Sequence, residues 1–251
     1  MTNVDCYNRS KHLSGAVALI GMLAFALFVL PGWALAQDVG PSALPDTIGS
    51  RVLACTACHG KEGQGANDDY FPRIAGKPAN YLYNQLVAFR VGRRKYPPMN
   101  YLLAYLPDSY LQEMAAYFAK QQPPFPTLPK PEVSAAVLAH GEALVLKGDP
   151  TRDVPACISC HGKAMTGMLP NVPGLLGLHS RYISAQIGAA RYGTRTSENP
   201  DCMQEIASRL NDDDVTAVAA WLSSRPAPTN PAPLPESSLK MPLVCGGSET
   251  K

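Results

Sequence analysis

The sequence carries little net charge of either sign. Its 251 residues include 22 Lys and Arg and 20 Asp and Glu, and the formal net charge is only +2. A nucleic-acid-binding protein usually shows a strong basic excess, so the composition argues against nucleic acid as a partner. It also gives no sign of one strongly charged protein partner.

Long apolar runs are equally scarce. The longest, residues 15–30, ends at Pro31 and falls short of the ~20 apolar residues that a membrane-spanning helix needs. It follows a short basic stretch and precedes an A-x-A cleavage site at residues 34–36. We expect residues 1–36 to be a signal peptide cleaved near Ala36, the alternative being an uncleaved anchor. The mature chain, of net charge +1, is expected in the periplasm, soluble or at most peripherally associated with a membrane.

Cysteine is also sparse, yet its placement is the strongest signal in the chain. Four of the seven Cys fall in two copies of Cys-x-x-Cys-His, at residues 55–59 and 157–161. This spacing is the attachment motif of c-type haem. Two thiols one helical turn apart can form thioether bonds to the two vinyl groups of a porphyrin, and the adjoining His then supplies an axial ligand to the iron. The sequence predicts two covalently bound haem c groups, held by Cys55, Cys58, Cys157 and Cys160, with His59 and His161 on the irons.

These cysteines allow two other interpretations. Paired Cys-x-x-Cys motifs with nearby His can form a zinc site, and a single Cys-x-x-Cys can be a redox dithiol. Zinc does not require His directly after the second Cys, whereas both copies have it. A dithiol does not require a distant Met at matched spacing, and this chain has one after each motif.

Three cysteines lie outside the two motifs. Cys6 falls in the expected signal peptide, which leaves Cys202 and Cys245. An even remainder in an exported protein favours a disulfide, here one that would tie the C-terminal tail beside the second haem. The alternatives are two unpaired thiols, or a Cys202 thiolate on the second iron.

The chain contains an internal repeat. Tyr81, Gln85, Arg90, Gly92 and Arg94 align with Tyr182, Gln186, Arg191, Gly193 and Arg195 at an offset of 101 residues, and beyond a short insertion the offset becomes 104. We infer that one unit has been duplicated. The expected domains are residues 37–121 and residues 133–225, with a Pro-rich linker at 122–132 and a Pro-rich tail at 226–251.

A Met in each repeat is the candidate for the second axial ligand. Met99 and Met203 follow their motifs at similar distances and align with each other, whereas Met114 has Val218 at the aligned position. A thioether favours ferrous iron and raises the reduction potential. We predict metal ligation by His59 and Met99 at one haem and by His161 and Met203 at the other. Met114 is expected to pack in the core.

Other groups around each site also repeat. Pro72 and Pro173 each follow their His by about a dozen residues, and a carbonyl there could accept the imidazole Nδ1–H and fix the ring. The alternative is that both are turn prolines. The recurring arginines are expected either to neutralise haem propionates, to bind across the domain interface, or to lie on solvated helix faces. His140 and His179 lack repeat counterparts and are expected to be ordinary polar residues.

The apolar spacing predicts an all-α fold. Helices are expected at about residues 79–91, 108–120 and 133–147, with a short helix before the first motif. Asp108 is the expected N-cap of its helix. The stretches that hold Met99 and Met203 are expected to be irregular.

These motifs together resemble the dihaem cytochrome c4 family. The likeness rests on Cys-x-x-Cys-His-Gly, Pro-x-Ile/Leu-x-Gly, Tyr-x-x-x-Gln, Arg-x-Gly-x-Arg, the paired Met and an Ala-Ala-Tyr/Trp segment, and it covers almost the whole mature chain. The resemblance implies two all-α cytochrome c domains in pseudo-twofold arrangement. It also implies electron transfer to a terminal oxidase or from a dehydrogenase. The longer second Met segment and the tail with Cys245 depart from it.

The expected function is therefore that of a periplasmic, monomeric electron carrier and not of an enzyme. Its partners would be redox proteins, a dehydrogenase or a terminal oxidase. Two alternatives remain, namely a haem enzyme resembling a thiosulfate dehydrogenase or a peroxidase, and the cytochrome subunit of a periplasmic dehydrogenase. A haem sensor is less favoured, because no output domain is present.

Overall fold

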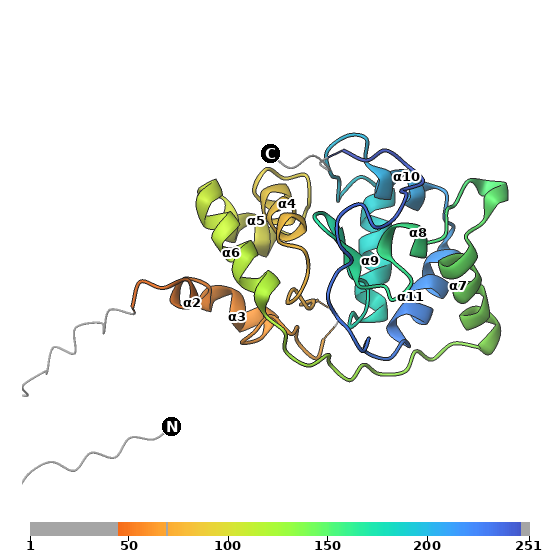
Figure 1. The fold of residues 1–251 in the computed structure, drawn as a ribbon, viewed down its shortest axis with the longest axis horizontal. Coiled ribbons are helices and arrows are strands. Elements are labelled where there is room, and N and C mark those ends of the chain that lie inside the picture. The colour runs from red at the N-terminus through yellow and green to blue at the C-terminus, as the bar shows by residue number, and fades with distance from the viewer. Residues whose placement is uncertain (1–44, 69, 247–251) are drawn as a thin grey trace, which may run out of the picture. The chain divides into compact units, whose positions relative to one another are not determined.

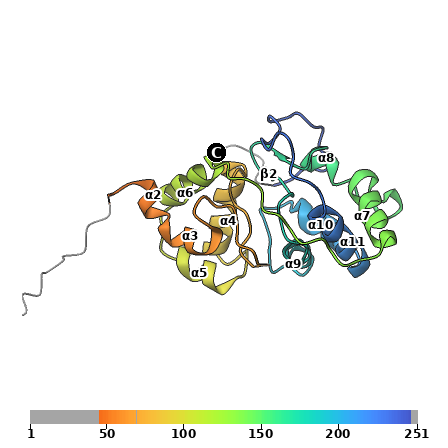
Figure 2. The same ribbon diagram turned by 90° about the horizontal axis from the view of Figure 1, so that it is seen from below.

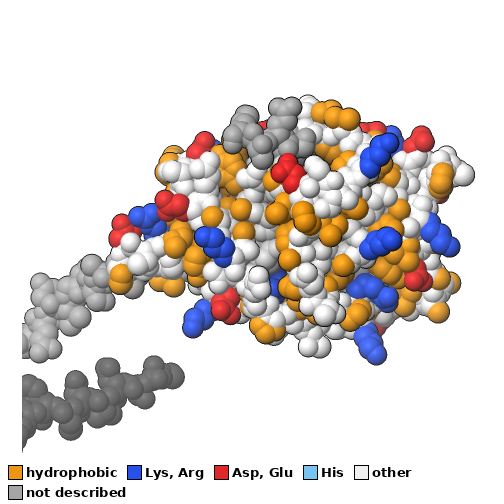
Figure 3. All heavy atoms as spheres, viewed as in Figure 1, with side chains coloured by type: hydrophobic (Ala, Val, Ile, Leu, Met, Phe, Trp, Pro, Cys, Tyr) orange, Lys and Arg blue, Asp and Glu red, His pale blue; other side chains and the backbone are white. Residues whose placement is uncertain are grey.

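The computed structural model describes residues 45–68 and 70–246, which form helices joined by irregular segments (Figure 1). The expected signal peptide and its cleavage site lie outside these residues. Within the described ranges, no helix is long and apolar enough to span a bilayer. On the face drawn in Figure 3, Lys and Arg are interspersed with Asp and Glu, in keeping with the low net charge.

The first half forms a helical group of its own, which keeps together in the two views of Figures 1 and 2. Its helices are α2 (Ile48–Arg51), α3 (Leu53–His59), α4 (Ala79–Arg90), α5 (Pro97–Leu103) and α6 (Asp108–Lys120). The helical spacing of Leu111, Met114 and Phe118 places these side chains on one buried face of α6. Met114 is thus a core residue, as predicted.

The second half has its own core and a similar order of elements. They are α7 (Ala135–Lys147), a 3-10 helix (Pro150–Arg152), α8 (Ile158–His161), β1 (Gly167–Met168), β2 (Val172–Pro173), α9 (Ser180–Arg191), α10 (Cys202–Ser208) and α11 (Asp212–Ser223). Leu144 and Val145 of α7 pack with Val218 and Leu222 of α11. The two strands pair antiparallel and have only two residues each. The other elements of the described residues are helices, so the expected all-α class is confirmed for them.

The segment between the halves is extended and attached to both. Residues 121–134 contain no helix or strand. The guanidinium group of Arg73 donates hydrogen bonds to the carbonyls of Pro123 (2.7 Å) and Pro124 (2.9 Å). Phe125 lies under the same guanidinium at 4.2 Å and also packs against the second core. The proline-rich segment is therefore fixed along its path by specific contacts.

Two expectations about local structure are wrong. Met99 lies in helix α5 and Met203 in helix α10, where irregular stretches were expected. Asp108 is the first residue of α6 and does not cap it, because Pro107 occupies the N-cap position. The carboxylate of Asp108 instead accepts a hydrogen bond from Arg90 at 2.5 Å.

Candidate haem-binding sites

The first Cys-x-x-Cys-His motif forms the last five residues of helix α3. Cys55 and Cys58 are one helical turn apart, so both thiols lie on the same side of the helix. Both are half-buried and neither is in a disulfide. Cys55 packs against the hydrophobic core of the first half, and burial raises the pKa of its thiol. The motif thus presents two free thiols and one imidazole from a single helix.

The imidazole of His59 is held by a backbone carbonyl. Its Nδ1 lies 2.9 Å from the carbonyl oxygen of Pro72, and since a carbonyl can only accept, Nδ1 is the donor. This leaves Nε2 as the nitrogen that can bind a metal. Burial lowers the pKa of His59, while the bond to Pro72 acts in the opposite direction. The neutral imidazole that a metal requires is therefore favoured.

The second motif repeats this arrangement. Cys157 immediately precedes α8, which carries Cys160 and His161. Nδ1 of His161 lies 2.8 Å from the carbonyl oxygen of Pro173. Burial raises the pKa of Cys157 to about 11 and lowers the pKa of His161. The predicted contact between the His of each motif and a proline carbonyl is confirmed in both halves.

The two candidate Met ligands differ in their surroundings. Met99 is half-buried and packs against the same core cluster as Cys55. Met203 is 43% exposed and follows Cys202 at the start of α10. Met165 and Met168, which lie closer to the second motif, are buried, and Met165 belongs to the second core. Met203 therefore remains the candidate in the second half, on a less buried segment than its counterpart.

The segment that carries Met99 is tied to helix α4. The side-chain amide of Asn100 donates to the carbonyls of Phe89 (2.5 Å) and Arg94 (2.8 Å), and its oxygen accepts from the backbone N–H of Tyr96 at 2.8 Å. Gln204 occupies the aligned position in the second half. The Met203 segment is held in another way. The carboxylate of Asp201 accepts hydrogen bonds from the backbone N–H groups of Ser197 (2.6 Å) and Gln204 (3.1 Å), and Cys202 forms a disulfide.

Cys202 and Cys245 form a disulfide bond. The predicted bridge is confirmed, and the alternative of two unpaired thiols is excluded. A Cys202 thiolate is therefore not available as an iron ligand.

The first pair of repeated arginines acts within each half. Arg90 donates to the carboxylate of Asp108 and to the carbonyl of Leu106, the latter at 2.7 Å. Arg191 makes the equivalent contacts, to Asp212 and to the carbonyl of Leu210 at 2.8 Å. These arginines fix the end of one helix to the start of the next, and they do not lie between the halves.

The second pair of arginines joins the two halves. Arg94 donates to Gln85 of its own half (2.8 Å), and to Tyr182 (3.0 Å) and Gln186 (2.6 Å) of the other. Arg195 reciprocates by donating to Gln186 (3.4 Å), Tyr81 (3.1 Å) and Gln85 (3.3 Å). The backbones of Arg94 and Arg195 also pair as an antiparallel bridge. Residues aligned by the repeat therefore make matching contacts across a pseudo-twofold axis.

This cluster bears on whether the residues present suit a haem group. In the described part of the chain, Arg94 and Arg195 have Gln and Tyr oxygens as their hydrogen-bond partners, and these are neutral. Two half-buried guanidinium groups side by side favour a nearby anion. Haem propionates are such anions, and each half already supplies the thiol pair and an oriented imidazole. The residues therefore fit two haem c groups.

Two features of the structure were not foreseen from the sequence. The ammonium of Lys77, at a position where the repeat has Leu178, donates to the carbonyl of Gly174 at 2.7 Å. Burial lowers the pKa of Lys77 to about 7, with Arg73 and Arg195 acting in the same direction. The mismatch in the repeat is the only sequence signal that singles out this lysine.

A second unforeseen feature is a buried carboxylate in the second half. Asp214 is 1% exposed and accepts hydrogen bonds from Arg152 at 2.6 Å and from the N–H of Asn211 at 2.9 Å. His140 Nε2 lies 2.7 Å from its other oxygen. Burial would raise the pKa of Asp214, but these hydrogen bonds outweigh it and the net shift is downward. His140, expected to be an ordinary polar residue, takes part in this hydrogen-bond network.

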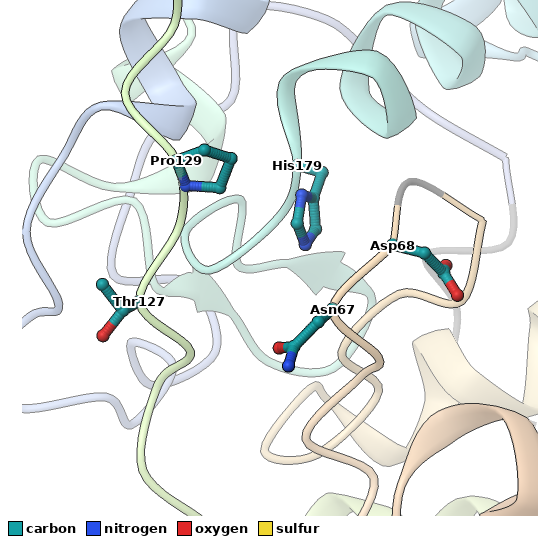
Figure 4. Close-up of a pocket in the computed structure, with 5 residues that line it drawn as sticks. All are labelled: Asn67, Asp68, Thr127, Pro129 and His179. Carbon is teal, nitrogen blue, oxygen red and sulfur yellow. The ribbon is translucent and has the colours of Figure 1, made fainter.

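A separate cavity of about 500 Å³ lies away from these motifs (Figure 4). It is lined by Asn67, Asp68, Thr127, Pro129 and His179. None of the candidate ligands lines it.

Comparisons with known proteins identify the family. A family model described as cytochrome c matches residues 47–124 and 139–226. A cytochrome c4 of Pseudomonas aeruginosa is 32% identical over 80% of this chain and 96% of its own length. The crystal structure of reduced cytochrome c4 from Pseudomonas stutzeri aligns with a TM-score of 0.59 and 29% identity, covering 70% of this chain and 95% of that one. The chain belongs to the dihaem cytochrome c4 family. It is accordingly a c-type cytochrome that binds haem c covalently and transfers electrons, and the zinc and dithiol interpretations are set aside.

Other relatives carry names related to thiosulfate. A protein of Thiomonas intermedia named thiosulfate dehydrogenase electron acceptor is 36% identical over 86% of this chain and 93% of its own length. The structure of a thiosulfate dehydrogenase from Marichromatium purpuratum aligns with a TM-score of 0.60 and 33% identity. This chain spans 36% of that longer protein.

Proposed function

We propose that this protein is a periplasmic electron carrier with two haem c groups, one in each of two domains at residues 37–121 and 133–225. Residues 122–132 link the domains, residues 226–251 form a tail, and residues 1–36 are a cleaved signal peptide. The duplicated Cys-x-x-Cys-His motif supports this most directly, because each copy has an imidazole oriented by a proline carbonyl. The cytochrome c4 relatives support the same role.

In this proposal each half supplies a complete set of ligands. Cys55 and Cys58 hold the first haem, with His59 and Met99 on its iron. Cys157, Cys160, His161 and Met203 serve the second in the same way. A haem with His and Met ligands exchanges one electron without exchanging ligands. The role of the chain is then to fix the imidazoles, keep water from the iron and supply cations near the propionates.

The experiment is an optically followed potentiometric titration of the exported protein, combined with mass spectrometry. We expect the mass of two haem groups beyond that of residues 37–251, and a titration that needs two one-electron waves. A colourless product, or one with a single haem, would contradict the proposal. A high-spin fraction in the resting ferric protein would indicate an open iron and favour an enzyme.

The relatives also suggest an electron donor. We infer that a thiosulfate dehydrogenase reduces this protein, because a relative matched over 93% of its own length is named as the acceptor of that enzyme. The protein is then a carrier and not the enzyme itself. Mixed with thiosulfate alone, the ferric protein should stay oxidised, and catalytic amounts of a purified thiosulfate dehydrogenase should reduce it. Reduction by thiosulfate without the dehydrogenase would reverse the assignment.

A further inference from the structure

The C-terminal segment, residues 226–246, has no counterpart in the first half. It is irregular, yet it is attached at two separate points in the second half. We refer to it as the strap. Its two attachments lie next to His161 and Met203, the two candidate ligands of the second haem.

The first attachment lies beside His161. The backbone N–H of Leu234 donates to the carbonyl of Gly167 at 2.9 Å, and its carbonyl accepts from Leu169, also at 2.9 Å. The side chain of Leu234 covers Gly162, the residue after His161. A Cβ atom on Gly162 would lie only 2.9 Å from Leu234 Cδ1. The strap therefore packs directly on the end of the haem-attachment motif.

The second attachment lies beside Met203. The disulfide joins the strap to Cys202, the first residue of α10, and Met203 is the next residue. The N–H of Gly246 donates to the carbonyl of Pro200 at 2.8 Å. A Cβ at Gly246 would come within 2.3 Å of the carbonyl oxygen of Asn199, so the backbones meet closely. The strap thus reaches the segment that carries Met203 by a covalent bond and by close backbone packing.

The first half holds its Met segment in a different way. There Asn100, next to Met99, binds the carbonyls at the end of α4 and holds the Met segment from within its own domain. In the second half Gln204 stands at that position, the Met segment is three residues longer, and Met203 is 43% exposed. Asp201 holds this longer segment only locally, through the N–H groups of Ser197 and Gln204, and the strap adds a constraint from a distant part of the chain.

We propose that the strap and its disulfide position Met203 on the second iron and so keep that haem closed to outside ligands. This rests on the proposed role of Met203 as a ligand. Cys202, Cys245 and Leu234 are positioning residues. Linking residues that are 43 apart in sequence restricts the conformations in which Met203 can leave the iron. The first haem does not depend on the strap.

The test compares imidazole binding to the ferric holoprotein with the double variant Cys202→Ser/Cys245→Ser. We expect one haem of the variant to bind imidazole at least tenfold more tightly and to lose its share of the far-red charge-transfer band, while the other haem is unchanged. Asn100→Ala is the matched control, and it should open the other haem instead. Haem identity is assigned in parallel with Met99→Ala and Met203→Ala.

The outcomes separate the proposal from the ligand assignment. If Met203→Ala leaves the far-red band and both potentials unchanged, Met203 is not a ligand and the site assignment fails. If Met203→Ala opens the second haem but the double Ser variant binds imidazole like the parent, the strap proposal alone is wrong. Should the Ser variant not mature, Leu234→Ala, which keeps the disulfide, decides. It should tighten imidazole binding at the second haem, and unchanged binding would overturn the proposal.

Discussion

At the residue scale, Lys77 is the clearest departure from the duplicated pattern. Its ammonium comes from the first half and binds the carbonyl of Gly174, next to Pro173, which holds His161. The repeat has an apolar Leu178 where this cation stands. Below its pKa of about 7 this lysine would carry a positive charge, which would disfavour the ferric state of a haem bound nearby.

Lys77 should make stability depend on pH. Its pKa is about 7 in the folded chain and ordinarily 10.5, so between these values the unfolded chain holds a proton that the folded chain has released. The free energy of unfolding should therefore rise with pH from about 7 toward 10.5, and the cost of the charged form is fully present below pH 7.

Lys77→Met should flatten this slope. Its effect on the free energy of unfolding should be more stabilising at pH 6 than at pH 9, by on the order of 1–3 kcal/mol. Urea unfolding at a series of pH values measures the effect. Lys61→Met, at an exposed position, serves as the control. Parallel pH profiles for the parent and Lys77→Met would show that the lysine is not responsible.

The two methionines of the first half should respond differently to truncation. Met99→Ala should lower the potential of one haem and admit external ligands, because a thioether ligand is lost. Met114→Ala should leave both potentials in place and lower the free energy of unfolding by about 2–4 kcal/mol, because Met114 is a buried core residue. Potentiometry and urea unfolding of both variants separate ligation from packing. An unchanged potential in Met99→Ala would remove it as a ligand.

At the scale of elements, the second core depends on the close approach of α7 and α11. Gly141 of α7 faces the backbone of Ala217, and a Cβ atom there would lie 2.1 Å from the Ala217 carbonyl oxygen and 2.9 Å from Trp221 Cβ. Any side chain at this position would force the helices apart. Gly188 of α9, by contrast, has nothing within 4 Å of a Cβ position.

These two helical glycines give a matched pair of substitutions. Gly141→Ala should destabilise the protein by about 1–3 kcal/mol, because the overpacked crossing outweighs the better helix propensity of Ala. Gly188→Ala should stabilise it by about 0.5–1 kcal/mol, since only the propensity changes. Thermal or urea unfolding of the two variants provides the comparison. Opposite signs are expected, and stabilisation by Gly141→Ala would show that the crossing can relax.

The helices that periodicity could reveal were predicted well, and so was the short helix before the first motif, whereas the short helices that carry the candidate Met residues were missed. Expected helices at 79–91 and 108–120 correspond to α4 and α6, because their apolar positions recur on one face. Helix α5 was missed because it opens with Pro97 and Pro98, which suggest an irregular stretch, although proline is tolerated in the first turn of a helix. Seven residues are also too few to show a helical period.

The parts of the site that depend on sequence motifs were predicted, and the parts that depend on contacts between distant residues were not. The attachment motifs, the proline carbonyls and the disulfide were foreseen, since each follows from the repeat or from a count of cysteines. The contacts of Lys77 and the Asp214 network were not, because they join residues far apart in sequence. No local pattern marks such pairs.

At the scale of the whole molecule, the two halves meet through residues that the repeat aligns. Besides the Arg94 and Arg195 side chains, the N–H of Lys95 donates to the carbonyl of Thr194, and the N–H of Thr196 donates to the carbonyl of Arg93, each at 2.9 Å. These are short contacts near the centre of the joint. Their loss should loosen the halves without unfolding either one.

Arg94→Gln/Arg195→Gln should therefore let the two halves unfold more independently. Calorimetry should show two separated transitions, or a broader one, where the parent shows closer coupling. Arg90→Gln/Arg191→Gln is the control. It removes ion pairs inside each half and should lower the transition temperatures without separating them. Equal separation of the transitions in both double variants would mean that other contacts hold the two halves together.

The matching contacts between the two halves bear on how the chain arose. Arg94 binds Tyr182 and Gln186, while Arg195 binds Tyr81 and Gln85, so one patch meets its own duplicate. Self-complementary contact of this kind is the mark of a symmetric homodimer. A single-haem ancestor that already paired with itself would need only the fusion of two gene copies to become this protein. Asymmetry, as at Lys77 and the strap, could then accumulate on one side only.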